Sequence, residues 1–184
     1  NNGIENLDYD VNLAPLVYEE FEGAFPPAGW TVVTNSGCGW ESSDTTGRDN
    51  YTGGAGFAAD ADSDYCGTGM NTELWSPSFD LSSASTAMLA FDSDFNDYLN
   101  SDDGYVDVST DGGATWTNVF HYNKADYRGP RTENVDLSPF AGQANVIVRF
   151  HYVAPGYDWW WQVDNVGVYA PAAWLSWLPD NGTV

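Results

Sequence analysis

Short runs of alternating apolar and polar residues, separated by turn residues, constrain this chain more than any other feature. Successive side chains of a strand point to opposite faces of a sheet, so such alternation is typical of strands with one buried face. Runs of this kind lie at Leu16–Phe21, Trp30–Asn35, Phe57–Asp62, Glu73–Phe79, Ala87–Phe95, Tyr105–Thr110, Thr115–Tyr122, Glu133–Leu137, Asn145–Val153 and Trp160–Tyr169. About ten short strands with turn signals between them predict an all-β, antiparallel β-sandwich.

The last of these runs changes the parity of its apolar residues part-way along. Trp161 and Val163 share one parity, whereas Val166 and Val168 share the opposite one. If both pairs face the core, an extra residue must be accommodated near Asp164. We therefore expect a β-bulge there that redirects the Asp164 carboxylate, since bulges often lie beside functional or metal sites.

The charge of the chain excludes several classes of function. Among 184 residues there are 27 Asp and Glu against 5 Lys and Arg, a formal net charge of −22. A surface of this sign repels phosphate, so neither nucleic acid nor an anionic membrane surface is an expected partner. No apolar run approaches the roughly 18 residues of a membrane span. The 16% aromatic content excludes a disordered acidic tail.

The acidic residues are mostly aspartate, and they cluster. Of the 27 acids, 20 are Asp, a residue that favours turns and binds cations. Two interpretations remain open: general surface acidity, as in a halophilic protein, and a calcium-loaded secreted protein. The clustering favours the second.

Two acidic groups are the best candidates for a structural calcium site. Asp60, Asp62 and Asp64 share one parity of an extended segment, where their charges repel unless a cation or water screens them. Glu20 and Glu22 repeat this pattern in the first expected strand. We expect at least one Ca²⁺ among the following acids, the alternative being a solvated acidic face: Glu20, Glu22, Asp60, Asp62 and Asp164.

A second acidic group lies in a loop. Asp97, Asp102 and Asp103 fall within the segment NDYLNSDDG. They could bind another cation, but a solvated turn is the favoured interpretation.

The chain has two cysteines, Cys38 and Cys66. In a reducing cytosol they would be a free pair or half a metal site, although no second Cys/His pair exists to complete a zinc site. In a secreted chain they would form one disulfide, worth roughly 3 kcal/mol on the chain-entropy model. We favour the disulfide. No signal peptide is visible at Asn1, so we expect a mature or excised fragment.

Motifs for catalysis are weak. The segment Ser109–Trp116 fits the Asp-box pattern S-x-D-x-G-x-T-W, which we interpret as a structural turn capped by Asp111. His121 and His151 both fall within expected strands, and no G-x-S-x-G nucleophile elbow is present. We expect no catalytic residue.

Aromatic residues offer a better candidate site. In the segment Tyr157–Trp161, alternation requires either Trp160 or its two neighbours to face away from the core. An exposed Trp or Tyr is a platform for a sugar ring or a partner protein. We therefore take Tyr157, Trp159 and Trp160 as candidate ligand-binding residues, the alternative being packing under a neighbouring loop.

Several segments together resemble a known family. They are Glu19–Trp30 (EEFEGAFPPAGW), Glu73–Leu81 (ELWSPSFDL), Asp103–Trp116, Val135–Gln143 (VDLSPFAGQ), Val146–Tyr152 and Trp161–Val166 (WQVDNV). In this order they resemble the MAM-like, choice-of-anchor J and cleaved-adhesin domains of secreted bacterial proteins.

The resemblance carries expectations of its own. It implies a jelly-roll β-sandwich that serves as an accessory module in large exported proteins. It also implies structural calcium held by Glu22 and Asp164, and Cys38 and Cys66 match a cysteine pair often seen in the family.

We accordingly expect three segments: a lead-in at 1–15, a jelly-roll domain at 16–170, and at 171–184 a linker with the truncated start of an Ig-like domain. The expected function is a non-catalytic, calcium-stabilised adhesion module of a secreted or cell-surface protein. Its partners would be carbohydrate or extracellular protein, beside other domains of the same chain. The alternative is a structural spacer or a self-associating subunit that pairs through strand edges and flanking segments.

Overall fold

Two antiparallel sheets pack face to face in the computed structural model, which describes residues 14–170. Sheet A has the order β3-β4-β11-β6-β9, with β1 also pairing with β11, and sheet B has the order β2-β5-β10-β7-β8. The strands of sheet A are β1 (Val17–Glu19), β3 (Glu41–Ser42), β4 (Ala59–Asp62), β6 (Met88–Asn96), β9 (Tyr127–Asp136) and β11 (Trp160–Tyr169). Those of sheet B are β2 (Thr31–Ser36), β5 (Met70–Trp75), β7 (Asp103–Ser109), β8 (Thr117–Asn123) and β10 (Ile147–Ala154). The predicted antiparallel sandwich is confirmed.

The core lies between the two sheets, where their apolar faces pack against each other. On β6 the side chains of Leu89, Phe91 and Phe95 are fully buried, as alternation predicts. Trp161 lies at the centre, with its ring centroid 5.9 Å from that of Phe95 and 5.8 Å from that of Phe150. The inner faces of both sheets therefore share one aromatic core.

The predicted bulge in β11 is confirmed. The pairing of β11 with β6 shifts register between Asp164 and Gly167, and Asn165 has a positive φ of 48°. The shift lets Val166 and Val168 face the core although their parity differs from that of Trp161.

Several expected boundaries were wrong. The strand expected at Glu133–Leu137 is β9, which already begins at Tyr127. The strand expected at Glu73–Phe79 is Met70–Trp75, because Ser76 and Pro77 interrupt the ladder and Phe79 makes only an isolated bridge to Val146. Between the strands expected at Trp30–Asn35 and Phe57–Asp62 lie β3 and the helix α1 (Ser43–Thr46), and a second helix, α2 (Ser63–Cys66), follows β4. A third short element, η1, is a 3-10 turn at Ser138–Phe140. Four-residue helices leave no periodic signal to detect in the sequence.

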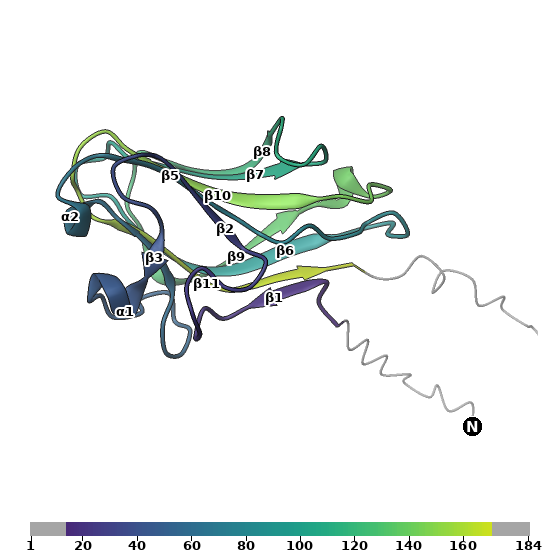
Figure 1. Cartoon of the computed structure of the whole chain (residues 1–184), viewed down its shortest axis with the longest axis horizontal. Coiled ribbons are helices and arrows are strands. Elements are labelled where there is room, and N and C mark those ends of the chain that lie inside the picture. The colour runs from purple at the N-terminus through teal and green to yellow at the C-terminus, as the bar shows by residue number, and fades with distance from the viewer. Residues whose placement is uncertain (1–13, 171–184) are drawn as a thin grey trace, which may run out of the picture.

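The two ends of the sandwich differ. Strand β1 begins and β11 ends at one end, whereas α1 and α2 lie toward the other (Figure 1). The loops 97–102 and 155–159 also lie at that other end, because Trp160 pairs with Asn96 and Tyr169 with Met88. No helix in the described range 14–170 is long and apolar enough to cross a membrane. The segments 1–13 and 171–184, including the expected Ig-like start, lie outside the described residues.

Candidate functional site

The first candidate site lies where two short strands follow one another along the same edge of β11. Strand β4 pairs with residues 160–163 of β11, and β1 pairs with residues 166–168. The bulge falls between these two stretches. The segment after β1, the segment before β4 and the bulge therefore meet at one place.

Three of the predicted calcium ligands gather here. We call this group, Glu20, Glu22 and Asp164 with the backbone at Gly54 and Gly56, the bulge cradle. Glu20 and Glu22 line a hollow of about 180 Å³ beside Gly56. The Asp164 carboxylate accepts hydrogen bonds from Asn50 Nδ2 at 2.8 Å and from the next backbone N–H at 2.7 Å, and Glu22 accepts one from the N–H of Phe57.

The cradle is acidic and lacks a protein cation. Asp164 is 1% exposed. Burial raises its pKa to about 6, and the neighbouring carboxylates of Glu22 and Asp92 act in the same direction. In the described part of the chain, no Lys or Arg forms an ion pair with Glu20, Glu22 or Asp164.

The cradle fits a calcium ion in the chemistry of its donors. Its side chains offer carboxylate oxygens, which Ca²⁺ prefers, and irregular backbone beside them offers carbonyl oxygens. The two glycines are required by space: a Cβ on Gly54 would collide with the Asp164 carboxylate, and one on Gly56 with the Glu22 carboxylate. The backbone at Gly54 and Gly56 therefore lies in close contact with the carboxylates that would bind the ion.

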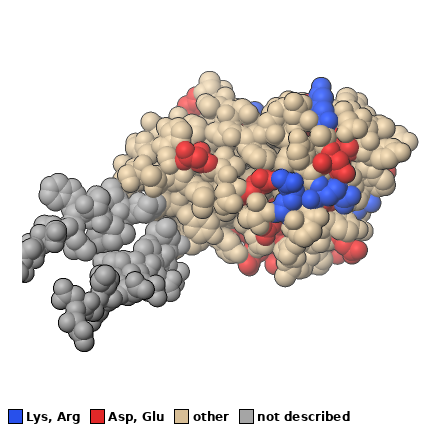
Figure 2. All heavy atoms as spheres, turned by 180° about the vertical axis from the view of Figure 1, so that it is seen from behind, with Lys and Arg blue, Asp and Glu red and all other residues tan. Residues whose placement is uncertain are grey.

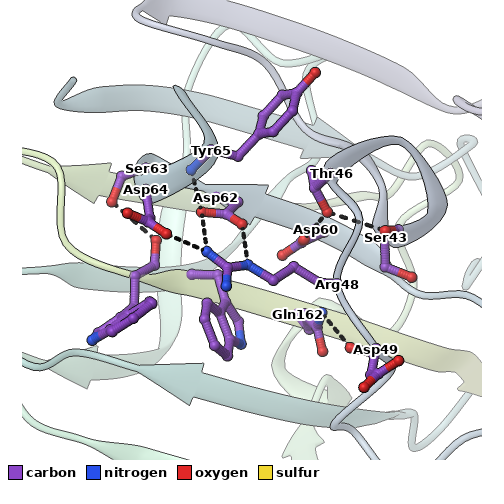
Figure 3. A network of polar contacts seen from close by, with 12 residues as sticks. Ser43, Thr46, Arg48, Asp49, Asp60, Asp62, Ser63, Asp64, Tyr65 and Gln162 are labelled. Atoms are coloured by element: carbon purple, nitrogen blue, oxygen red, sulfur yellow. Dashed lines mark hydrogen bonds and ion pairs between the residues drawn. The ribbon is translucent and has the colours of Figure 1, made fainter. Parts of the chain in front are cut away.

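The other two predicted calcium ligands lie in a separate network, so the five acids do not form one group. Asp62 pairs with Arg48, whose Nε lies 2.6 Å from Asp62 Oδ2, and Arg48 also reaches Asp64 (Figure 3). Asp60 accepts a hydrogen bond from the Thr46 hydroxyl at 2.5 Å, and burial raises its pKa to about 8. We call these residues the Arg48 network: Thr46, Arg48, Asp60, Asp62 and Asp64.

Other basic residues also form ion pairs with nearby acidic residues. Figure 2 shows Lys and Arg side chains gathered in one area, bordered by acidic side chains. The pairs are Arg48 with Asp62, Arg128 with Asp94, Arg131 with Glu133, and Arg149 with Glu73 and Asp107. The protein thus uses its few cations where acids are packed within the fold.

Trp160 is not the exposed platform that we considered. It is 5% exposed, because Tyr51 stacks on its ring at 5.5 Å and the Arg48 guanidinium lies 4.2 Å from its centroid. Its Nε1 donates to Asp94 at 2.8 Å. The alternative, packing under a neighbouring loop, is correct for this residue, since the segment after α1 folds over the outer face of sheet A.

Tyr157 and Trp159 do line an open hollow of about 370 Å³, which we call the loop-end hollow. Tyr157 is 63% exposed, and the hollow also includes Tyr98, which is 74% exposed, and Leu99. Sequence reasoning missed these last two. The signal was a Tyr-Leu pair inside an otherwise polar, acidic loop, where large apolar residues have no core to fill.

A buried acidic cluster supports this hollow from below. Asp97, Asp102 and Asp158 place carboxylate oxygens within 4.8 Å of one another, and burial raises the pKa of Asp102 to about 6. Asp158 accepts the N–H of Leu99 at 2.7 Å, which holds the Tyr98 loop against the loop that precedes β11. The solvated turn expected for Asp97 and Asp102 is wrong, because both side chains are buried, although Tyr98 and Leu99 between them are exposed.

The third member of that expected turn, Asp103, lies apart from the cluster. It is 2.8 Å from His121 Nε2 on β8. The other histidine, His151 on β10, contacts the side chain of Asn71. Both histidines therefore lie within strands, as expected.

The cysteines form a disulfide, with Cα atoms 5.8 Å apart. The predicted pair is confirmed. The bridge joins the residues before β3 to the end of α2, so it encloses both the Arg48 segment and the two glycines of the bulge cradle.

The Asp-box turn is confirmed as a structural element. Asp111 accepts the N–H and the hydroxyl of Thr115 at 2.9 and 2.6 Å, and these bonds, with that from Ser109, lower its pKa to about 2. Trp116 lies on the outer face of sheet B, edge-on to Trp75.

No family model and no curated protein matches this chain, but solved structures do. The K1 cleaved adhesin domain of Lys-gingipain from Porphyromonas gingivalis W83 matches with a TM-score of 0.62 and 20% identity, covering 85% of this chain and 98% of that domain. This chain has a cleaved-adhesin-like fold. The resemblance drawn from its sequence motifs is therefore confirmed at the level of fold.

Two further structures extend the comparison. The K3 cleaved adhesin domain of Lys-gingipain matches with a TM-score of 0.59 and 16% identity over 86% of this chain and 100% of that one. TmCBM61, solved in complex with β-1,4-galactotriose, matches with a TM-score of 0.56 and 14% identity over 86% and 99%. The fold is thus shared by adhesin domains and a carbohydrate-binding module.

Proposed function

We propose that this chain is a non-catalytic, calcium-stabilised binding module of an extracellular protein, and that it binds carbohydrate in the loop-end hollow. The observation that carries the proposal is the exposure of Tyr98 and Tyr157 beside Trp159 in one hollow. Large aromatic rings grouped in the open at the tips of two adjacent loops are unusual unless a ligand or partner covers them.

The chemistry of the hollow suits a sugar. Its aromatic rings offer flat apolar faces for the C–H groups of a pyranose, and Asp64 and Asp158 stand at its border as acceptors for hydroxyl groups. The net charge of −22 disfavours acidic glycans, so the proposal specifies neutral ones. The galactotriose complex of TmCBM61 supports carbohydrate as the class of ligand.

The calcium ion has a structural role in this proposal. Glu22 and Asp164 would hold it, with Glu20 beside them, where it would tie together β1, the segment before β4 and the bulge of β11. The disulfide and the adhesin neighbours support an extracellular location, and a calcium-loaded site suits the same setting.

The test is calorimetric titration of the chain with β-1,4-galactotriose and a panel of neutral oligosaccharides, in calcium. We expect saturable binding that weakens at least tenfold in Tyr157→Ala and in Tyr98→Ala, since truncating an aromatic anchor has effects of this size. Tyr65→Ala is the matched control, because Tyr65 is 52% exposed and does not line the hollow. Equal affinity in all three variants would contradict the proposal. If the chain binds none of the glycans, a protein partner is favoured instead.

A further inference from the structure

A second aromatic surface lies on the outer face of sheet B, away from the loop-end hollow. It is an open hollow of about 440 Å³ over β10, β7 and β8. We call it the sheet B groove. The residues that matter here are Tyr105, Trp116, Asn118, Arg149 and His151.

Two aromatic rings stand at a distance from each other along this groove. Tyr105 stacks on His121 with ring centroids 4.2 Å apart and planes 13° apart. Trp116 precedes Thr117, which pairs with Val108, and its ring lies against Arg149. Arg149 pairs with Asp107, two residues along β7 from Tyr105, which is about 7 Å at ~3.4 Å per residue. The groove thus has a ring near each end.

The Asp-box turn places the second of these rings. Gly113 has a φ of 90°, and a Cβ there would collide with the Trp75 ring. The turn therefore lies flat on Trp75, which meets Trp116 edge-on at 4.9 Å. The motif thus has a consequence beyond its own hydrogen bonds, because it fixes a ring at the end of the groove.

The polar groups between the rings are held in place without a ligand. Arg149 lies 2.8 Å from Glu73 and 2.9 Å from Asp107, and its guanidinium stacks over Trp116 at 4.3 Å. Asn118 donates to Asp107 at 2.9 Å. Groups fixed in this way lose little freedom on binding, which favours affinity.

The charge of the groove favours a neutral ligand. Two carboxylates outweigh the single charge of Arg149, which disfavours an anionic ligand. Burial, together with Arg149, lowers the pKa of His151, which disfavours its charged form. Strands β10 and β7 under the middle of the groove are each paired on both sides, so an added peptide strand could pair within sheet B only at the outer edge of β8.

From these observations we infer that the sheet B groove is a second carbohydrate site, which takes a neutral oligosaccharide laid between Tyr105 and Trp116. Sugar C–H faces cover the two rings, and hydroxyl groups reach Asn118 and Arg149. The inference rests on the proposed function for its class of ligand but not for its residues.

The test separates the two sites. Soluble β-1,4-galactan, xylan and mannan are first compared by affinity electrophoresis, and an oligosaccharide of whichever polymer retards the chain is then titrated calorimetrically. We expect two oligosaccharides per chain. Tyr105→Ala and Trp116→Ala should each weaken one of the two by at least tenfold and leave the other unchanged.

Each result decides between the claims. If the chain binds one oligosaccharide, and Tyr157→Ala abolishes this binding whereas Tyr105→Ala does not, the proposed groove site is wrong and the proposed function stands. Loss in the groove variants, with Tyr157→Ala unaffected, supports the groove and contradicts the loop-end hollow, and no binding to any of the three polymers contradicts both. The thermal unfolding midpoint of each variant shows whether it is folded. If Trp116→Ala is not folded, Asn118→Ala takes its place in the test, because the Asn118 side chain is exposed.

Discussion

Two acidic groups on this molecule look alike in sequence and differ in how their charge is balanced. In the Arg48 network, a cation from the segment after α1 reaches Asp62 and Asp64 and covers Trp160. In the bulge cradle, Asp164 is just as buried, yet within residues 14–170 no Lys or Arg pairs with it or with Glu22.

The difference shows why a pattern of acids alone does not identify a metal site. Closely packed carboxylates need a positive charge or a proton. The first group needs no cation from solution, because the Arg48 guanidinium pairs with Asp62 and Asp64 and the raised pKa of Asp60 favours its protonated form. We propose that the second group takes a cation from solution, and this lack of a protein cation is the physical basis for proposing calcium in the cradle.

Removing the disulfide should have the largest effect on both groups, because Cys38 and Cys66 close the segment that carries Arg48, Gly54 and Gly56. For a sequence separation of 28 residues, we expect the double variant Cys38→Ala/Cys66→Ala to lose about 3.5 kcal/mol of unfolding free energy. Urea unfolding with calcium present measures this. A loss below about 1 kcal/mol would mean that tertiary contacts alone hold the segment.

Arg48→Met should disrupt the Arg48 network alone. It leaves Asp62, which is 2% exposed, without its cation and uncovers Trp160, so we expect a loss of about 3 kcal/mol. Arg131→Met is the matched control, since its ion pair with Glu133 is partly exposed and should be worth less than about 1 kcal/mol. Similar losses in urea unfolding for both variants would remove the distinction that we draw.

Gly56→Ala should disturb the cradle alone. Its φ of 64° disfavours alanine by about 1–2 kcal/mol, and the new Cβ also displaces the Glu22 carboxylate. Gly47→Ala has a similar φ of 75° but open space around its Cβ, so it reports the backbone effect by itself. We expect a larger loss for Gly56→Ala than for Gly47→Ala in calcium, and a smaller difference between the two variants in chelator.

The raised pKa of Asp60 gives a pH-dependent test of the difference between the two acidic groups. Its pKa is about 8 in the folded chain and near 4 when unfolded, so between these values the folded state holds a proton that the unfolded state has lost. Stability from this group therefore falls as pH rises from 4 to 8. Asp60→Asn should become progressively more stable relative to wild type over that range in thermal melts, whereas a constant difference would contradict the assigned proton.

What could be predicted from the sequence is what depends on local periodicity. Alternation located the strands that surround Phe95 and Phe150, and the change of parity located the bulge before Val166. Burial by loops could not be predicted in this way. Trp160 is covered by a segment more than 100 residues away in sequence, and the side chain of Asp102 is buried beside Asp158 from another loop.

Assignment of the acids failed for the same reason. Asp62 and Asp164 were both expected among the calcium ligands, and the tertiary position of Arg48, which pairs with Asp62, separates them. The Tyr98 loop was interpreted through its charges, although its exposed ring proved to be the feature that joins Tyr157 and Trp159.

The most direct test of this account is a set of thermal melts in calcium and in chelator for wild type, Glu22→Gln and Asp64→Asn. Asp64 belongs to the Arg48 network and is exposed, so it serves as the control. At a calcium concentration of 100 times Kd, binding should add about 2.7 kcal/mol, a rise of several degrees in Tm. The account predicts this rise in wild type and Asp64→Asn but not in Glu22→Gln. An equal rise in all three proteins, or none in wild type, would contradict it.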